Sequence, residues 1–120
     1  KFGLIVHGAD YGYIAVENRK DGHYISQGTC TGADKGNKET VQDGQKAGKT
    51  DIYFRLVVKE NAQCSFSFSE DGKSFTSAGG SFKAMPGRWV GARVGFFFTR
   101  LNKTNDAGQV KLDWFRITKE

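Results

Sequence analysis

Two histidines, two cysteines and one glycine-rich stretch are the parts of this sequence whose residue types could carry out chemistry. His7 and His23 have no third ligand at a spacing that suits zinc. Cys30 and Cys64 lack the Cys-x-x-Cys spacing of redox sites and the nucleophile elbow of hydrolases. Residues 44–50 end like a phosphate-binding loop, but the stretch is one residue short and precedes a strand pattern. None of these groups predicts a catalytic site.

Carboxylates could support glycoside hydrolysis, which needs two of them about 5–10 Å apart across a cleft. Only Asp10, Asp51 and Asp113 stand beside apolar sequence. Hydrogen bonds at strand ends explain such positions more simply than catalysis does.

A set of aromatic and arginine side chains is the stronger candidate, and we interpret it as a sugar-binding face. Tyrosine, tryptophan and phenylalanine rings stack on the C–H bonds of a sugar, and arginine donates hydrogen bonds to its hydroxyls. Gly91 and Gly95 leave space on this face. An alternative is that the face packs against a missing strand or a neighbouring domain. The predicted contacts are Tyr53, Arg55, Trp89, Arg93 and Phe97, with Tyr11 and Tyr13 on a neighbouring strand as second choices.

The elements that must position these residues are strands, because apolar residues alternate with polar ones and do not recur at helical spacing. Residues 52–58 and 64–69 show this period of two most clearly. Glu70-Asp71-Gly72-Lys73 between two such runs predicts a hairpin. Many short strands separated by turns predict an antiparallel β-sandwich. We expect strands near 2–7, 11–18, 23–31, 38–42, 51–59, 63–69, 74–77, 89–99 and 109–118.

Length and charge limit the classes of function. A chain of 120 residues is long enough for one domain, and no apolar run reaches the roughly 20 residues that a membrane helix needs. The excess of 18 basic over 13 acidic residues is spread along the chain, which favours solubility over nucleic-acid binding. The sequence therefore predicts neither a nucleic-acid nor a membrane partner. The spacing of Cys30 and Cys64 leaves open whether they form a disulfide or are two buried thiols.

Five motifs, in order along the chain, resemble the C-terminal β-sandwich module of family 43 glycoside hydrolases, found on β-xylosidases and arabinofuranosidases. The motifs are GLIV (3–6), ADYGYI (9–14), CSFSFSEDGKSF (64–75), PGRWVGARVG (86–95) and LDWFRI (112–117). Thr99-Arg100 followed by Lys103-Thr104-Asn105-Asp106 looks like the version from Bacteroidetes. Phe98 departs from the family, which often has a small residue or Cys there.

This resemblance implies a concanavalin A-like jelly roll that binds xylan or arabinoxylan without catalysis, as an accessory module of a secreted or periplasmic bacterial enzyme. Alternatively, it implies a structural domain that buttresses the catalytic domain and shapes the mouth of its active site without binding free sugar. No catalytic residue and no cofactor is expected. The resemblance also places Cys30 and Cys64 in strands, where cysteines are often small buried hydrophobic residues, so we favour free thiols over a disulfide. A structural calcium ion is a further expectation, with Asp113 as its candidate ligand.

The resemblance also places Lys1 inside the sandwich, so we expect residues 1–120 to be the C-terminal part of a single module that lacks its first strands. Sheet edges with unpaired N–H and C=O groups promote aggregation. We therefore expect another polypeptide to complete the sheets, most simply the remainder of the parent glycoside hydrolase, the alternative being a second copy of this chain.

Overall fold

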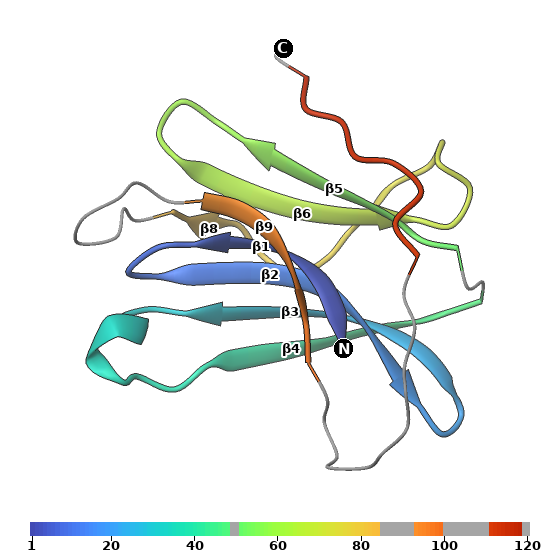
Figure 1. The fold of residues 1–120 in the computed structure, drawn as a ribbon, viewed down its shortest axis with the longest axis horizontal. Helices are drawn as coiled ribbons and strands as arrows, with labels where there is room; N and C mark the ends of the chain where they lie inside the picture. The colour runs from blue at the N-terminus through green and yellow to red at the C-terminus, as the bar shows by residue number, and fades with distance from the viewer. Residues whose placement is uncertain (49–50, 85–92, 100–110, 119–120) are drawn as a thin grey trace.

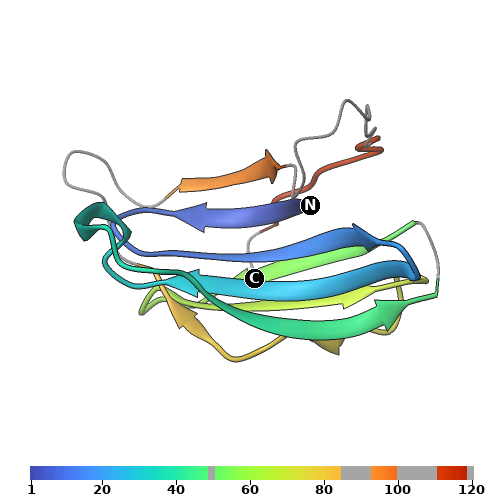
Figure 2. The ribbon, with the colours of Figure 1, turned by 90° about the horizontal axis from the view of Figure 1, so that it is seen from below.

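The computed structural model describes residues 1–48, 51–84, 93–99 and 111–118, and these form two antiparallel sheets. Sheet A has the order β4-β3-β2-β1-β9, and sheet B has the order β5-β6-β7 with β8 also paired to β6. The two sheets lie against each other as two layers (Figures 1 and 2). The strands of sheet A are β1 (Phe2–His7), β2 (Tyr11–Arg19), β3 (Gly22–Cys30), β4 (Thr40–Ala47) and β9 (Arg93–Phe98). Those of sheet B are β5 (Tyr53–Val58), β6 (Gln63–Ser69), β7 (Thr76–Ser77) and β8 (Phe82–Lys83). One 3-10 turn, η1 (Ala33–Lys35), follows β3.

Alternation along the strands builds the core, because every second side chain of each sheet points toward the other sheet. These side chains define the inner face of each sheet, and the side chains between them define its outer face. The predicted antiparallel β-sandwich is confirmed. The buried core residues are Leu4, Val6, Ile14, Ile25 and Ala47 from sheet A, and Cys64, Phe66, Phe68 and Phe82 from sheet B.

The first three strands and the strand at β6 lie where the alternation predicts them, to within one residue. β5, β7 and β9 are shorter than predicted, and the first four residues of the 89–99 prediction lie outside the described residues. β8 was not predicted, because two residues are too short to show a period. All nine strands of the described part pair antiparallel.

The prediction of a strand at 38–42 is wrong in extent, since β4 spans Thr40–Ala47. The pairing of β3 with β4 shifts between Tyr24 and Ser26, so that Gly44 and Gln45 together face Ile25. This is a β-bulge, in which one strand has two residues opposite one of its partner. A side chain at Gly44 would come 1.7 Å from the Ile25 carbonyl oxygen, so the bulge requires glycine there. The polar, turn-like sequence 42–45 concealed a strand that pairing with β3 stabilises.

The prediction of a strand at 109–118 is wrong for residues 111–118, which form no strand. This segment passes next to β5 in Figure 1 and is held by aromatic contacts, with Trp114 6.0 Å from Tyr53 and Phe115 5.2 Å from Phe96 between ring centroids. It makes no ladder of hydrogen bonds with a described strand, and residues 109–110 lie outside the described residues.

The two cysteines are buried free thiols, which confirms the interpretation from sequence. Cys30 ends β3 in sheet A and Cys64 lies on β6 in sheet B. Among the described residues, no helix is long and apolar enough to cross a membrane.

The sandwich is open on the side of β9 and β5, which are edge strands of sheets A and B. The inner-face residues of β9 are exposed, with Val94 at 48%, Phe96 at 39% and Phe98 at 51% of their surface. Such residues are normally covered by a facing sheet. Among the described residues, no strand pairs with the outer edge of β9 or of β5, and apolar side chains are exposed beside the edge of β9.

Candidate functional site

The predicted contact residues do not share one face. β9 belongs to sheet A, so Arg93 and Phe97 lie on the outer face of sheet A, whereas β5 belongs to sheet B and carries Tyr53 and Arg55 on the outer face of that sheet. Trp89 lies outside the described residues. The prediction of a single face across these strands is wrong, because alternation shows which side of its own sheet a residue faces but not which sheet it joins.

The second-choice residues Tyr11 and Tyr13 lie with Phe97 on the outer face of sheet A. Their rings form a continuous series with His7, which we call the aromatic row (His7, Tyr11, Tyr13 and Phe97). The ring centroids of His7 and Tyr11 are 6.0 Å apart and those of Tyr11 and Tyr13 are 6.5 Å apart, both pairs nearly parallel. Tyr13 meets Phe97 edge to face at 4.9 Å. Strands β1, β2 and β9 thus contribute to one aromatic surface.

Glycines on neighbouring strands let two of these rings lie flat on the sheet. Tyr13 pairs with Gly28, and a side chain at 28 would come within 2.3–2.4 Å of the Tyr13 ring and hydroxyl. Phe97 pairs with Gly3, where a side chain would come 2.7 Å from the Phe97 ring. Aromatic rings that cover cross-strand glycines shield the exposed backbone. The position of each ring on the sheet therefore depends on both the aromatic residue and the glycine that it covers.

Glu39 anchors the two tyrosines, and no pattern in the sequence indicates this role. The Tyr11 hydroxyl donates a hydrogen bond of 2.7 Å to Oε2 of Glu39, and the Tyr13 hydroxyl donates one of 2.7 Å to Oε1. Burial, followed by the hydrogen bond to Glu39, raises the pKa of both tyrosines above the ordinary value of 10. Lys1 Nζ also donates a hydrogen bond of 3.3 Å to the Tyr13 hydroxyl. Both phenols therefore stay protonated and hold fixed orientations.

Exposure separates the residues that can touch a ligand from those that position them. Tyr13 is only 3% exposed, so its ring cannot stack on a sugar and instead supports Tyr11 and Phe97. Tyr11 and Phe97 are half-buried, and His7, Glu39 and Arg93 are exposed. The face thus offers flat rings beside a carboxylate acceptor and a guanidinium donor.

A smaller cluster lies on the outer face of sheet B. The Arg55 guanidinium lies 3.7 Å from the centroid of the Phe75 ring, and Tyr53 contacts Trp114, which is 59% exposed. Arg55 is thus already stacked on an aromatic ring of its own chain. The two clusters are on opposite outer faces of the sandwich.

Asp113, the candidate calcium ligand, lies exposed in the C-terminal segment, 3.7 Å from Lys111 Nζ. Calcium takes six to eight oxygen ligands. Within residues 1–48, 51–84, 93–99 and 111–118, no three His, Cys, Asp or Glu side chains are grouped to hold a metal ion. The calcium site stays a prediction.

Comparison with known proteins bears on the fold. Residues 1–118 match the family described as the β-xylosidase C-terminal concanavalin A-like domain. A curated β-xylosidase from Formosa agariphila is 36% identical over 72 residues, which is 60% of this chain and 12% of that protein. The chain thus spans only a small part of that relative. No solved structure matches. Since the family covers nearly the whole chain, this protein belongs to the β-xylosidase C-terminal concanavalin A-like domains.

Proposed function

We propose that this domain is a non-catalytic carbohydrate-binding module that holds xylan or arabinoxylan on the outer face of sheet A. The observation that carries the proposal is the aromatic row, with its two phenols fixed on Glu39. Sugar rings present C–H bonds to aromatic surfaces and hydroxyls to charged and polar groups. The face supplies both kinds of partner.

Each residue has a separate role in this proposal. Tyr11 and Phe97 stack on sugar rings, while Arg93 donates to hydroxyls and Glu39 accepts from them. Tyr13 is a positioning residue, because its buried ring fixes its neighbours. No step breaks or forms a covalent bond.

The family supports the choice of ligand, since the relative from Formosa agariphila is named a β-xylosidase. A domain that holds xylan would raise the local concentration of substrate for a hydrolase on the same polypeptide. We propose that the parent protein is such a glycoside hydrolase, secreted or periplasmic. Membranes and nucleic acids are not among the proposed partners.

Affinity electrophoresis in gels containing soluble xylan or arabinoxylan tests the proposal. The domain should be retarded, and Tyr11→Ala should migrate freely. Tyr53→Ala is the matched control, because it removes the same residue type from the outer face of sheet B. Unchanged thermal midpoints would show that both variants fold. Migration unaltered by every xylan tried, or equal loss in both variants, would contradict the proposal.

A structural role is the second candidate function, and the open side of the sandwich favours it. Val94, Phe96 and Phe98 are exposed on the inner face of β9, and no strand in the described part of the chain pairs with the outer edges of β9 and β5. We propose that further polypeptide of the same enzyme adds strands there and attaches the domain firmly to its neighbour. Size-exclusion light scattering tests this. A stable, well-folded 13.3 kDa monomer without an accompanying peptide would contradict it.

A further inference from the structure

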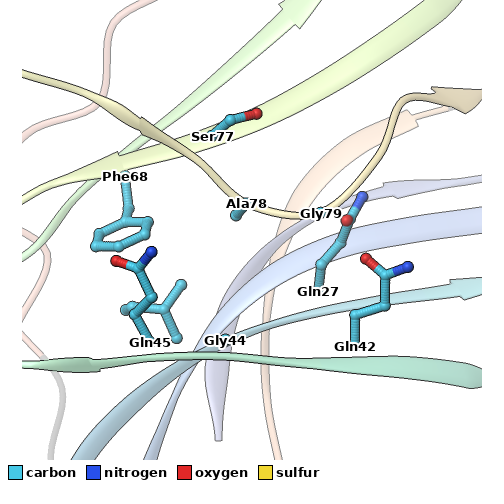
Figure 3. A pocket seen from close by; sticks show the side chains of 9 residues that line it. Gln27, Gln42, Gly44, Gln45, Phe68, Ser77, Ala78 and Gly79 are labelled. Carbon is cyan, nitrogen blue, oxygen red and sulfur yellow. The ribbon is translucent and has the colours of Figure 1, made fainter.

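A cavity of about 280 Å³ lies between β4 and the segment that follows β7, on the side of the sandwich away from β9. Figure 3 shows Gln45 and Phe68 at one end of this cavity and Gln27 and Gln42 at the other, with Gly44 and Ala78 facing each other between them. The aromatic row contributes no residue to it. The lining residues are Ile25, Gln27, Gln42, Gly44, Gln45, Phe68, Ser77, Ala78 and Gly79.

The bulge in β4 brings two of the three glutamines that line the cavity, Gln42 and Gln45, to the same side of the strand. Side chains three positions apart point to opposite sides of a regular strand. Gln42 and Gln45 nevertheless both line the cavity, because the extra residue at Gly44–Gln45 turns Gln45 to the same side. Bulges commonly redirect side chains next to functional sites.

Gln27 is held in place at one end of the cavity. It is 4% exposed, and its Nε2 donates a hydrogen bond of 2.9 Å to the Gly80 carbonyl oxygen. Its Oε1 has no hydrogen-bond partner among the described residues. A side chain at Gly79 would come 1.3 Å from this oxygen and 2.8 Å from Oε1 of Gln42, so the two amide oxygens converge at Gly79.

The lining indicates a neutral ligand with several hydroxyls. Each amide both donates and accepts hydrogen bonds, and Ser77 adds a hydroxyl. The side chains of Gln42, Gln45 and Ser77 make no hydrogen bond to described residues, so they are available to a ligand. No lining residue is charged, and Phe68 and Ile25 supply an apolar wall. The volume of about 280 Å³ is slightly below the range of roughly 300–1,000 Å³ that is usual for ligand sites, which limits the ligand to about one ring.

We infer that this cavity is a second binding site, which takes one neutral polyhydroxylated ring such as a free pentose or the end unit of a sugar chain. The choice of a sugar rests on the proposed function, whereas the location of the site does not. The outer face of sheet A would hold the length of a polysaccharide, and the cavity would hold a single unit.

Titration calorimetry of the 120-residue domain with xylose and with arabinose tests the inference. Gln42→Ala and Gln45→Ala should each weaken binding by roughly 2- to 10-fold, the loss of one hydrogen bond. Gln63→Ala is the matched control, because that amide bonds Ser81 outside the cavity and should leave binding unchanged. Both cavity residues are exposed, so their substitution should not unfold the domain.

Three outcomes would overturn the inference: no heat of binding for either pentose, equal weakening by Gln63→Ala, or an equal response to glycerol. Tyr11→Ala separates this site from the proposed function. It should abolish retention by xylan gels and leave pentose binding intact. Gln45→Ala should weaken pentose binding and leave retention by xylan gels intact, so that either site can fail alone.

Discussion

Replacing Gly28 with alanine tests how the aromatic row is built. A Cβ atom at 28 would lie 2.3–2.4 Å from Cζ, Cε1 and the hydroxyl oxygen of Tyr13, so the ring must leave the sheet. No left-handed conformation is involved, since the φ angle at 28 lies outside that region. The variant therefore isolates the effect of displacing Tyr13.

The expected loss of stability follows from the contacts of that ring. Its hydrogen bond to the Glu39 carboxylate contributes about 1.5–3 kcal/mol, and its pairing with Phe97 about 0.5–1.5 kcal/mol. Replacing a strand glycine with alanine returns about 0.5–1 kcal/mol. We expect a net loss of about 1–4 kcal/mol, measured by urea unfolding, and a fall in thermal midpoint of roughly 4–16 °C.

Gly95→Ala is the matched control, because Gly95 lies on the same outer face and has no atom near an added Cβ. It should leave the free energy of unfolding within about 1 kcal/mol of the original. In a Tyr13→Ala background, Gly28→Ala should cost nothing, because the clash is gone. An equal cost in both backgrounds, or none in either, would refute the reasoning.

Three further predictions concern other parts of the fold. Glu39→Gln should lower the pKa of Tyr11 and Tyr13 toward the ordinary value without reaching it, since burial also raises this pKa. Alkaline absorbance titration measures the change, and an unchanged tyrosine pKa in the variant would contradict the prediction. The backbone N–H of Lys73, with that of Ser74, lowers the pKa of Asp71 from 3.8 to about 2. The resulting stabilisation is complete above pH 4 and disappears as the pH falls toward 2. Asp71→Asn should therefore lower the thermal midpoint at neutral pH and make the midpoint depend less on pH in acid. If the thermal midpoints of the variant and the original protein change in parallel with pH, the hairpin contacts do not stabilise the fold in this way. Phe66→Ala should lower the free energy of unfolding by about 3–5 kcal/mol in urea, because Phe66 is fully buried in the core, and a loss under 1 kcal/mol would show that the sheets pack differently.

Alternation in the sequence was sufficient to predict the strands that carry the aromatic row. Tyr11 and Tyr13 are two apart on β2, so they share a face whatever the partner strands are. The same argument failed for Tyr53, because its face depends on which sheet β5 joins, and that is decided by long-range pairing.

The anchor of the row could not be predicted for a related reason. Glu39 is 28 residues from Tyr11 and meets it only because β2, β3 and the start of β4 pair in one register. The bulge at Gly44 was equally hidden, since its sequence resembles a turn. Local sequence patterns predict which face of a strand a residue occupies, whereas the register of strand pairing determines which residues come into contact.

Amide chemical-shift mapping during titration with xylohexaose tests most directly the claim that the outer face of sheet A binds xylan. We expect the largest shifts around Tyr11 and Phe97 and little change around Tyr53. Shifts centred on Tyr53 and Arg55, or none at saturating oligosaccharide, would contradict the account.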